Sequence, residues 1–325
     1  MRRRDCIMLI GGAATWPLAA RAQQPTMPVI GWLSAVSQAE TAHMVGAFRR
    51  GLSEAGFVEG QSIAIDYRFA DGRYDRLSAW AAEFVRRPVA LIAAQAPPAA
   101  IAAKTASTTI PIVFVVGLDP VAAGLVASFN RPGGNATGMT LMTGPLAQKR
   151  LELMLELVPR ATAVAMLVNP ISPDAAPELR DAQAAAQENT LALTLFNAST
   201  PDEINAAFAA LAQQRPDALL VGTDPFFMTR REDIVALAAR QRIPAVYPFR
   251  EFVQSGGLIS YGTNIAKAYH QAGSYAGRIL KGAQPADLPV QQPTTFELVL
   301  NLSTAKALGI AVAATLHARA DEALE

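Results

Sequence analysis

Short apolar runs alternate with amphipathic stretches in the first half of the chain. The runs at 89–95 and 110–117 are continuously apolar, too short for helices and bounded by Pro and Gly, which is typical of strands covered on both faces in a parallel sheet, whereas 62–70 alternates. The stretches between them have the spacing of helices with one apolar face. The predicted strands lie at 29–33, 62–70, 89–95 and 110–117, and the predicted helices at 41–55 and 74–86.

The same alternation starts again in the second half. Its predicted strands lie at 163–169, 191–198, 217–223 and 243–248, and its predicted helices at 146–157, 176–188, 201–214 and 230–240. Two successive runs of alternating strands and helices predict two doubly wound α/β units. A stretch rich in Thr, Gly and Pro at 139–145 is the natural connection between them.

After residue 248 the regular alternation of predicted strands and helices ends. A strand-like segment at 256–262 is followed by a predicted helix at 265–281 and an extended segment at 288–301. A last short helix is predicted at 303–308. The appended helix and extended segment indicate that the chain crosses between the two units again, so that several segments form one hinge.

The N-terminal residues 1–22 have the pattern of a secretory signal peptide. Three arginines at 2–4 precede a mostly apolar stretch at 6–20, and Ala20-Arg21-Ala22 fits a signal peptidase site. The apolar stretch is too short to span a hydrocarbon core of about 30 Å. We therefore expect export to the periplasm, with cleavage near Ala22.

The charge balance disfavours several classes of partner. Without residues 1–22 the chain has 24 Lys and Arg against 26 Asp and Glu, a net charge of −2. This balance gives no electrostatic footprint for nucleic acid or for an anionic membrane surface. The single cysteine, Cys6, lies in the predicted signal peptide, so the mature chain can form no disulfide and no thiolate metal site.

Enzyme signatures are missing from the sequence. It has no G-x-S-x-G elbow, no phosphate-binding G-x-x-x-x-G-K-[ST] loop and no H-E-x-x-H motif. The three histidines, His43, His270 and His317, are far apart on predicted helices. We therefore expect no catalytic residue, no metal ligand and no cofactor.

Candidate ligand-binding residues follow from the fold class. In open α/β sheets, ligands bind outside the carboxyl ends of the strands, where unpaired N–H groups at helix N-termini attract ligand oxygens. The candidates lie just after apolar strands or near the expected hinge: Ser34, Ser37, Gln95, Ala96, Asp119, Asn169, Asp224, Phe226, Phe227, Tyr247 and Tyr261.

Each polar candidate also has a purely structural interpretation. Asp224 follows a predicted strand and could accept a ligand ammonium or hydroxyl group, or it could cap the next turn. Asp119 precedes a predicted helix, where capping is favoured. Asn169 could contact a ligand or form a turn.

The aromatic candidates also have two interpretations each, one functional and one structural. Phe226, Phe227 and Tyr247 could form an aromatic wall of the site, or they could pack in the core. Tyr261 could face either the cleft or the core between the units. An aromatic wall together with one carboxylate suits a compact apolar solute with a charged group.

Four longer segments carry a resemblance to a known family: DPVAAGLVASFNRPGGNATG at 119–138, DPFFMTRREDIVALAARQRIPAVYPFREFVQSGGLISYG at 224–262, AYHQAGSYAGRILKGAQPADLPVQQPTTFELVLN at 268–301 and AKALGI at 305–310. The tail HARADEALE at 317–325 fits as well. In their order and spacing these segments resemble the ABC-transporter substrate-binding family with a type I periplasmic-binding fold.

The resemblance implies two doubly wound parallel-sheet lobes joined by a three-crossing hinge, with the ligand bound between them. The expected first lobe comprises 27–142 plus 262–291, and the second comprises 143–261 plus 292–325. The expected function is that of a monomeric periplasmic protein that delivers a small molecule to an ABC permease and its cytoplasmic ATPase. A soluble ligand-sensing protein that reports to a signalling partner is the alternative.

Some members of this family bind aromatic amino acids, so an aromatic or branched amino acid or a related organic acid is the expected ligand. The loop after the third strand departs from the family pattern. It commonly offers Gly and a Ser or Thr hydroxyl, whereas here it reads Ala94-Gln95-Ala96-Pro97-Pro98. Gln95 and nearby backbone N–H groups could hold a ligand carboxylate in place of that hydroxyl.

Overall fold

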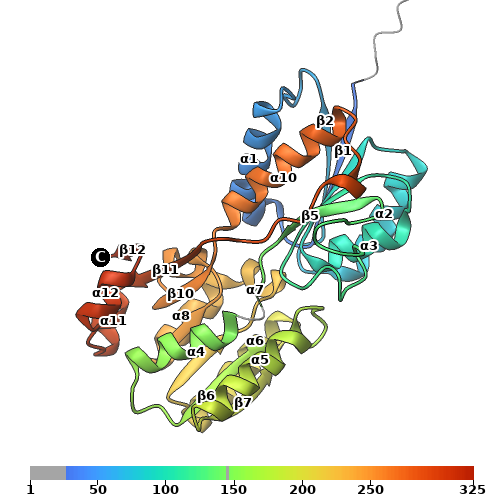
Figure 1. Cartoon of the computed structure of the whole chain (residues 1–325). Helices are drawn as coiled ribbons and strands as arrows, with labels where there is room; N and C mark the ends of the chain where they lie inside the picture. The colour runs from blue at the N-terminus through green and yellow to red at the C-terminus, as the bar shows by residue number, and fades with distance from the viewer. Residues whose placement is uncertain (1–26, 144–145) are drawn as a thin grey trace, which may run out of the picture.

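The computed structural model describes residues 27–143 and 146–325, so the predicted signal peptide lies outside the described residues. The chain forms two α/β lobes, one above the other in Figure 1. The first lobe is built on a parallel five-stranded sheet in the order β2-β1-β3-β4-β5. Its strands are β1 (Val29–Ser34), β2 (Ala64–Phe69), β3 (Leu91–Gln95), β4 (Ile112–Val116) and β5 (Ala136–Thr140).

Helices cover both faces of this sheet. They are α1 (Gln38–Glu54), α2 (Leu77–Arg86), α3 (Pro97–Ala106) and, from much later in the chain, α10 (Ile265–Leu280), with the short helices η1 (Tyr74–Arg76) and η2 (Pro285–Asp287). Helix α10 lies alongside α1 (Figure 1). A Cβ atom at Gly51 or Gly273 would lie 2.0 Å from a carbonyl oxygen of the partner helix. Glycine at these two positions therefore allows the close contact between α1 and α10.

The second lobe has a seven-stranded sheet in the order β12-β11-β10-β9-β8-β6-β7. Its strands are β6 (Ala163–Val168), β7 (Ala192–Asn197), β8 (Ala218–Val221), β9 (Ala245–Tyr247), β10 (Ile259–Thr263), β11 (Phe296–Asn301) and β12 (Glu322–Leu324). Its helices are α4 (Leu146–Leu157), α5 (Ala175–Glu188), α6 (Pro201–Gln214), α7 (Pro225–Thr229), α8 (Arg231–Gln241), α9 (Arg250–Gln254), α11 (Leu302–Leu308) and α12 (Ala314–Arg319).

Three segments link the two sheets: the one after β5, the one between β10 and α10, and the one that leads into β11. They lie side by side. Thr263 Oγ1 donates a hydrogen bond of 2.9 Å to the carbonyl of Leu141, which joins the first two segments. The N–H of Gln291 donates to the carbonyl of Gly138 and its carbonyl accepts from Thr140, each at 2.9 Å, which joins the third segment to β5.

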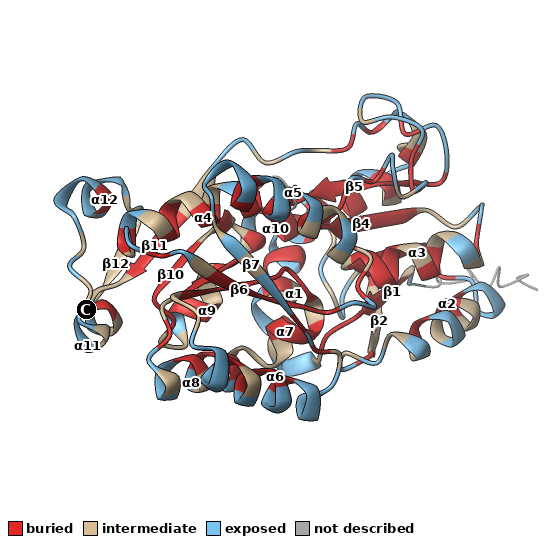
Figure 2. Cartoon of the chain, turned by 90° about the horizontal axis from the view of Figure 1, so that it is seen from below, coloured by how far each residue is buried: buried red, intermediate tan, exposed pale blue. Residues whose placement is uncertain are grey.

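Buried residues concentrate on the central strands of both sheets, whereas the outer faces of helices such as α6 and α8 are exposed (Figure 2). One apolar cluster runs from the first lobe into the second. In the first lobe it is centred on Trp32, whose ring lies 5.1 Å from that of Phe48 and 5.9 Å from that of Tyr269. Within the described ranges, no helix is long and apolar enough to cross a membrane.

The strand and helix alternation of the sequence reappears in the two lobes, and a few elements differ from the predictions. Helix α3 was not expected, because its Ala-rich sequence is buried nearly all round and shows little periodicity. The segment after Asp119 forms turns instead of the expected helix. Strand β11 runs antiparallel to β10, so the second sheet is not wholly parallel. The acidic C-terminal tail supplies the edge strand β12.

Candidate functional site

A cavity lies between the lobes, at the carboxyl ends of β3 and β4 in one sheet and of β8 in the other. This is the position at which open α/β sheets bind ligands. The cavity contains about 480 Å³ of empty space, part of it open to solvent. Its wall is mostly apolar, with Val36, Met44, Val115, Leu141 and Ile265 among the contributors from the first lobe and its links, and Met228 and Phe249 from the second.

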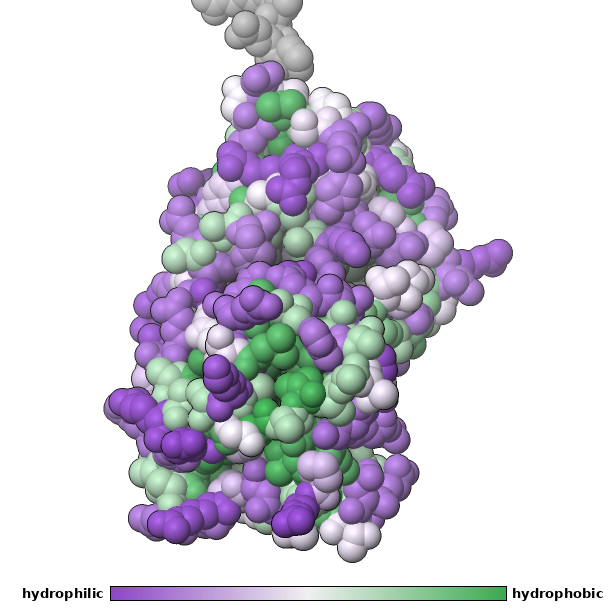
Figure 3. Space-filling model, turned by 90° about the vertical axis from the view of Figure 1, so that its left-hand side faces the viewer, coloured by the Kyte–Doolittle hydropathy of each residue, from purple (hydrophilic) through white to green (hydrophobic). Residues whose placement is uncertain are grey.

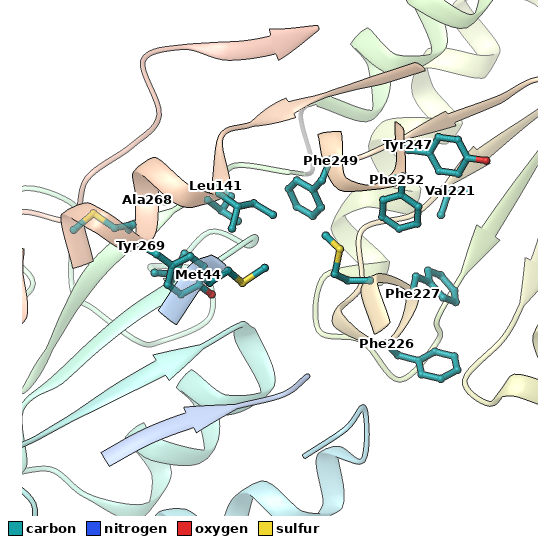
Figure 4. Close-up of a cluster of buried hydrophobic side chains, with 14 of the residues drawn as sticks. Met44, Leu141, Val221, Phe226, Phe227, Tyr247, Phe249, Phe252, Ala268 and Tyr269 are labelled. Atoms are coloured by element: carbon teal, nitrogen blue, oxygen red, sulfur yellow. The ribbon is translucent and has the colours of Figure 1, made fainter. Parts of the chain in front are cut away.

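The apolar side chains face one another across this space. Figure 4 shows Met44, Leu141 and Tyr269 on one side, and on the other Phe249, whose ring points toward Leu141. Met44 comes from α1 and Tyr269 from α10. A ligand between the lobes would thus bury an apolar body against both of them, which stabilises binding in proportion to the apolar area removed from water.

Asp224 is at the second-lobe side of the cavity and is fully engaged in hydrogen bonds. Its Oδ1 accepts from Asn169 Nδ2 and from the N–H of Phe226, each at 2.9 Å, so it caps α7. Its Oδ2 accepts at 2.9 Å from the hydroxyl of Tyr74 in the first lobe. Burial raises the pKa of Asp224, and these hydrogen bonds oppose that shift. Burial and the nearby Asp224 carboxylate raise the pKa of Tyr74 well above its ordinary value.

Asp174 is the second carboxylate of the cavity, and it is differently placed. Its side chain is 3% exposed, and its Oδ1 has no hydrogen-bond partner among the described residues. Burial raises its pKa well above the usual value, and the carboxylates of Glu178 and Asp224 add to the shift. A Cβ atom at Gly117 in the first lobe would lie 3.1 Å from Asp174 Oδ1. The free oxygen therefore faces the opposite lobe.

A buried ion pair in the second lobe positions one residue of the cavity wall. Arg150 on α4 is 0% exposed; its Nη1 donates to Glu178 Oε1 at 2.8 Å and its Nε donates to the Tyr261 carbonyl at 2.9 Å. Glu178 also accepts from the N–H of Thr223 at 2.7 Å and from its hydroxyl at 3.0 Å. Burial lowers the pKa of Arg150 and raises that of Glu178. The pair fixes Thr223, which lines the cavity.

The first-lobe side of the cavity includes the start of α3. Ser34 Oγ donates to Gln95 Oε1 at 2.5 Å, and Gln95 Nε2 donates to Met44 Sδ at 3.2 Å. The N–H of Ala96 donates to the carbonyl of Val115. Pro97 and Pro98 occupy the first two helical positions and have no N–H. The side chain of Gln95 and the N–H of Ala96 are therefore occupied within the protein, and the N–H groups of the first two helical positions are missing.

The structure brings only some of the predicted site residues to the cavity. Gln95, Ala96 and Asp224 line it. Asn169 is hydrogen-bonded to Asp224, and Ser34 is hydrogen-bonded to Gln95. Ser37 caps α1 by accepting from the N–H of Glu40, and the exposed Asp119 accepts from the N–H groups of Val121 and Ala122.

The predicted aromatic residues lie away from the cavity wall. Phe227 and Tyr247 are buried in the second-lobe core, where Tyr247 stacks on Phe252 (Figure 4). Phe226 packs near Gly72 of the first lobe, and the Tyr261 ring lies 5.9 Å from Phe296. The aromatic wall is formed instead by Phe249 and Tyr269.

Sequence reasoning missed Asp174, Tyr74, Met44, Met228 and Tyr269. Asp174 lies in the loop after β6, five residues beyond Asn169, and a search extended over that whole loop would have included it. Met44 and Tyr269 lie inside helices, and their sequence context carries no signal for a site.

Polar side-chain pairs also join the lobes around the cavity. Glu40 of α1 pairs with Arg231 of α8, and His43 Nε2 of α1 lies 3.3 Å from Glu251 Oε1 of α9. Figure 3 shows hydrophilic surface where the lobes meet on one face, while the main hydrophobic area of that face lies on the second lobe. Together with the Tyr74–Asp224 hydrogen bond, these pairs hold the two lobes in contact.

Comparison with known proteins agrees with this architecture. The model of the family described as ABC transporter substrate binding protein matches residues 30–324. A tyrosine-binding protein of Clostridioides difficile (strain R20291) is 30% identical over 261 residues, which cover 80% of this chain and 75% of the relative.

Two solved structures are similar over nearly their whole length. The structure of an ABC domain from Streptococcus pneumonia in complex with L-Trp has a TM-score of 0.84 at 24% identity and covers 91% of this chain and 99% of that one. The ligand-free, open structure of a substrate binding protein with adhesive properties from Clostridium difficile has a TM-score of 0.66 at 26% identity, covering 92% and 99%.

Proposed function

The chain belongs to the family of ABC transporter substrate binding proteins, and we propose that it serves an ABC importer in the periplasm by capturing a small molecule that carries an ammonium group on an apolar body. The observation that carries this proposal is the free oxygen of Asp174 in a cavity with an apolar wall. A buried carboxylate without a partner is costly, and an ammonium group that donates to it removes that cost.

Aromatic and branched amino acids are the first ligands to consider. Phe249 and Tyr269 can pack against an aromatic or branched side chain. The tyrosine-binding relative supports this ligand class. An organic acid without an ammonium group is disfavoured, because it would approach both Asp174 and Asp224 with a like charge.

Lobe closure is the proposed mechanism of capture. The three linking segments, near Thr143, Tyr261 and Gln292, would act as the hinge between a lobe of 27–142 plus 262–291 and a lobe of 143–261 plus 292–325. The interlobe contacts fit the closed state, and the TM-score is higher with the Trp complex than with the open, ligand-free structure. A ligand that contacts both lobes favours closure because it binds the closed state better.

Calorimetry with matched solutes tests the ligand class. We expect phenylalanine and leucine to bind, because their ammonium groups can donate to Asp174, and we expect phenylpropionate and neutral sugars to bind far more weakly. Phenylpropionate is the matched control, because it differs from phenylalanine by the ammonium group alone. Binding of phenylpropionate or of a sugar as tightly as the ammonium compounds would refute the proposal.

Tyr74→Phe tests closure. The substitution removes the donor to Asp224 and is expected to weaken ligand binding by about 1.5–3 kcal/mol, the range for a hydrogen bond to a charged group. Small-angle scattering should show a larger radius of gyration for the variant than for the wild type at the same subsaturating ligand concentration. Tyr67→Phe is the control, because it removes a hydrogen bond to Glu59 within the first lobe. Equal effects of both variants would contradict the closure mechanism.

A further inference from the structure

We propose that the cavity selects amines over the corresponding α-amino acids, so that its preferred ligand has an ammonium group, an apolar body and no carboxylate. This inference rests on the proposed function and narrows its ligand class. It depends on the charges and N–H groups that the cavity offers.

The charged side chains that line the cavity have one sign. Asp174 and Asp224 both contribute, and none of the described lining residues is Lys, Arg or His. Asp224 is already satisfied by three donors, and Asp174 keeps a free oxygen. The site can therefore neutralise one ligand cation and has no side-chain cation to pair with a ligand anion.

Backbone N–H groups are the usual substitute for a cation in a fold of this kind, because a helix N-terminus offers several of them to an anion. At α3 this substitute is weakened. Pro97 and Pro98 remove the N–H groups of the first two helical positions, and the N–H of Ala96 is bonded to Val115. Gln95, the side-chain donor at the residue before Ala96, is held by Ser34 and Met44.

The guanidinium of Arg150 does not fill this role. It is 0% exposed, its Nη1 is paired with Glu178 and lies 3.4 Å from Thr223 Oγ1, and its Nη2 is buried without a hydrogen-bond partner among the described residues. Its charge is therefore compensated inside the second lobe. A ligand carboxylate in the cavity would lose its hydration and lie beside Asp174 and Asp224, two side chains whose charged forms burial already disfavours, and it would find no cationic side chain among the described lining residues.

The test is calorimetry with three compounds of one series: phenethylamine, phenylalaninamide and phenylalanine. The amide matches the amino acid in size and lacks its negative charge. Like-charge contacts at an interface cost several kcal/mol, so the amine and the amide should each bind at least about tenfold more tightly than the amino acid. Leucine and isoamylamine form a second pair with the same expected order.

The outcomes separate the two proposals. Equal or tighter binding of phenylalanine and leucine would overturn the selectivity for amines and leave the proposed function standing. If no compound of either series binds, the ammonium ligand class itself fails, and the selectivity fails with it.

A variant isolates the physical cause. Pro97→Ser combined with Pro98→Ala restores two N–H groups and adds a hydroxyl at the start of α3, so it should lower the ratio of amine affinity to amino-acid affinity by about tenfold or more. Pro201→Ala is the matched control, because Pro201 opens the exposed helix α6 away from the cavity. An unchanged ratio in the double variant would contradict the assignment of selectivity to this helix start.

Discussion

Replacement of Asp174 by Asn is expected to lower the affinity for an ammonium-bearing ligand by about 2–5 kcal/mol, the range for removing one partner of a buried charge pair. Asn keeps the size of the side chain and removes its negative charge, so the ligand cation would be buried without a counter-charge. Calorimetry with phenethylamine and phenylalanine measures the loss. Asp119→Asn serves as the control, because Asp119 is exposed and caps a turn outside the cavity.

The same substitution should leave the ligand-free fold intact or stabilise it. The free oxygen of Asp174 is buried, and burial disfavours its charged form, as the raised pKa indicates. A neutral amide avoids this cost. Thermal unfolding without ligand should therefore give a melting temperature at or above that of the wild type. A variant that loses ligand binding and folding stability together would contradict a role for Asp174 in the ligand contact.

The pH dependence follows from the same group. The folded pKa of Asp174 lies above its unfolded value of about 3.9. Between these two values the folded chain holds more protons, so its ligand-free stability falls as the pH rises through the folded pKa. Glu178 and Asp224 shift in the same direction. Ammonium binding needs the ionised carboxylate of Asp174, so the affinity for an ammonium-bearing ligand should fall as the pH drops below the folded pKa of Asp174. In Asp174→Asn, the part of this pH dependence that is due to Asp174 should be absent.

The fold was predictable because it depends on patterns repeated along the chain. Buried parallel strands are continuous apolar runs, and most of the helices between them are amphipathic, so the alternation is visible along most of the chain. Helix α3 was not predicted because it is buried nearly all round, with alanines at half of its positions. The antiparallel direction of β11 was not predicted either, because it depends on where the third linking segment returns to the second lobe.

The candidate site was predictable in its place and only partly in its residues. Strand ends locate Gln95, Ala96 and Asp224, which line the cavity. Whether an aromatic side chain points into the cavity depends on local geometry that sequence does not carry, so Phe249 faces the cavity while Tyr247, two residues earlier, is in the core (Figure 4). The residues from α1 and α10 depend on the packing of two helices that lie far apart in sequence.

Replacement of Arg150 by Met is expected to destabilise the protein by about 3–5 kcal/mol, the range for removing one partner of a buried ion pair. The variant leaves Glu178, which is 2% exposed, with an uncompensated charge and removes the donor to the Tyr261 carbonyl. Urea unfolding should show a lower midpoint. The half-buried surface pair Lys149–Glu152 on the same helix gives a control, because Lys149→Ala should cost about 1 kcal/mol or less.

A double variant separates charge from packing at this position. If the loss in Arg150→Met comes from the unpaired carboxylate, adding Glu178→Gln should recover much of the stability, because replacing both members of a buried pair by neutral residues is often close to neutral. The amide oxygen introduced by Glu178→Gln would still be able to accept from the N–H of Thr223. If the double variant unfolds as easily as Arg150→Met alone, the lost packing and the lost bond to Tyr261 dominate, and the electrostatic explanation is wrong.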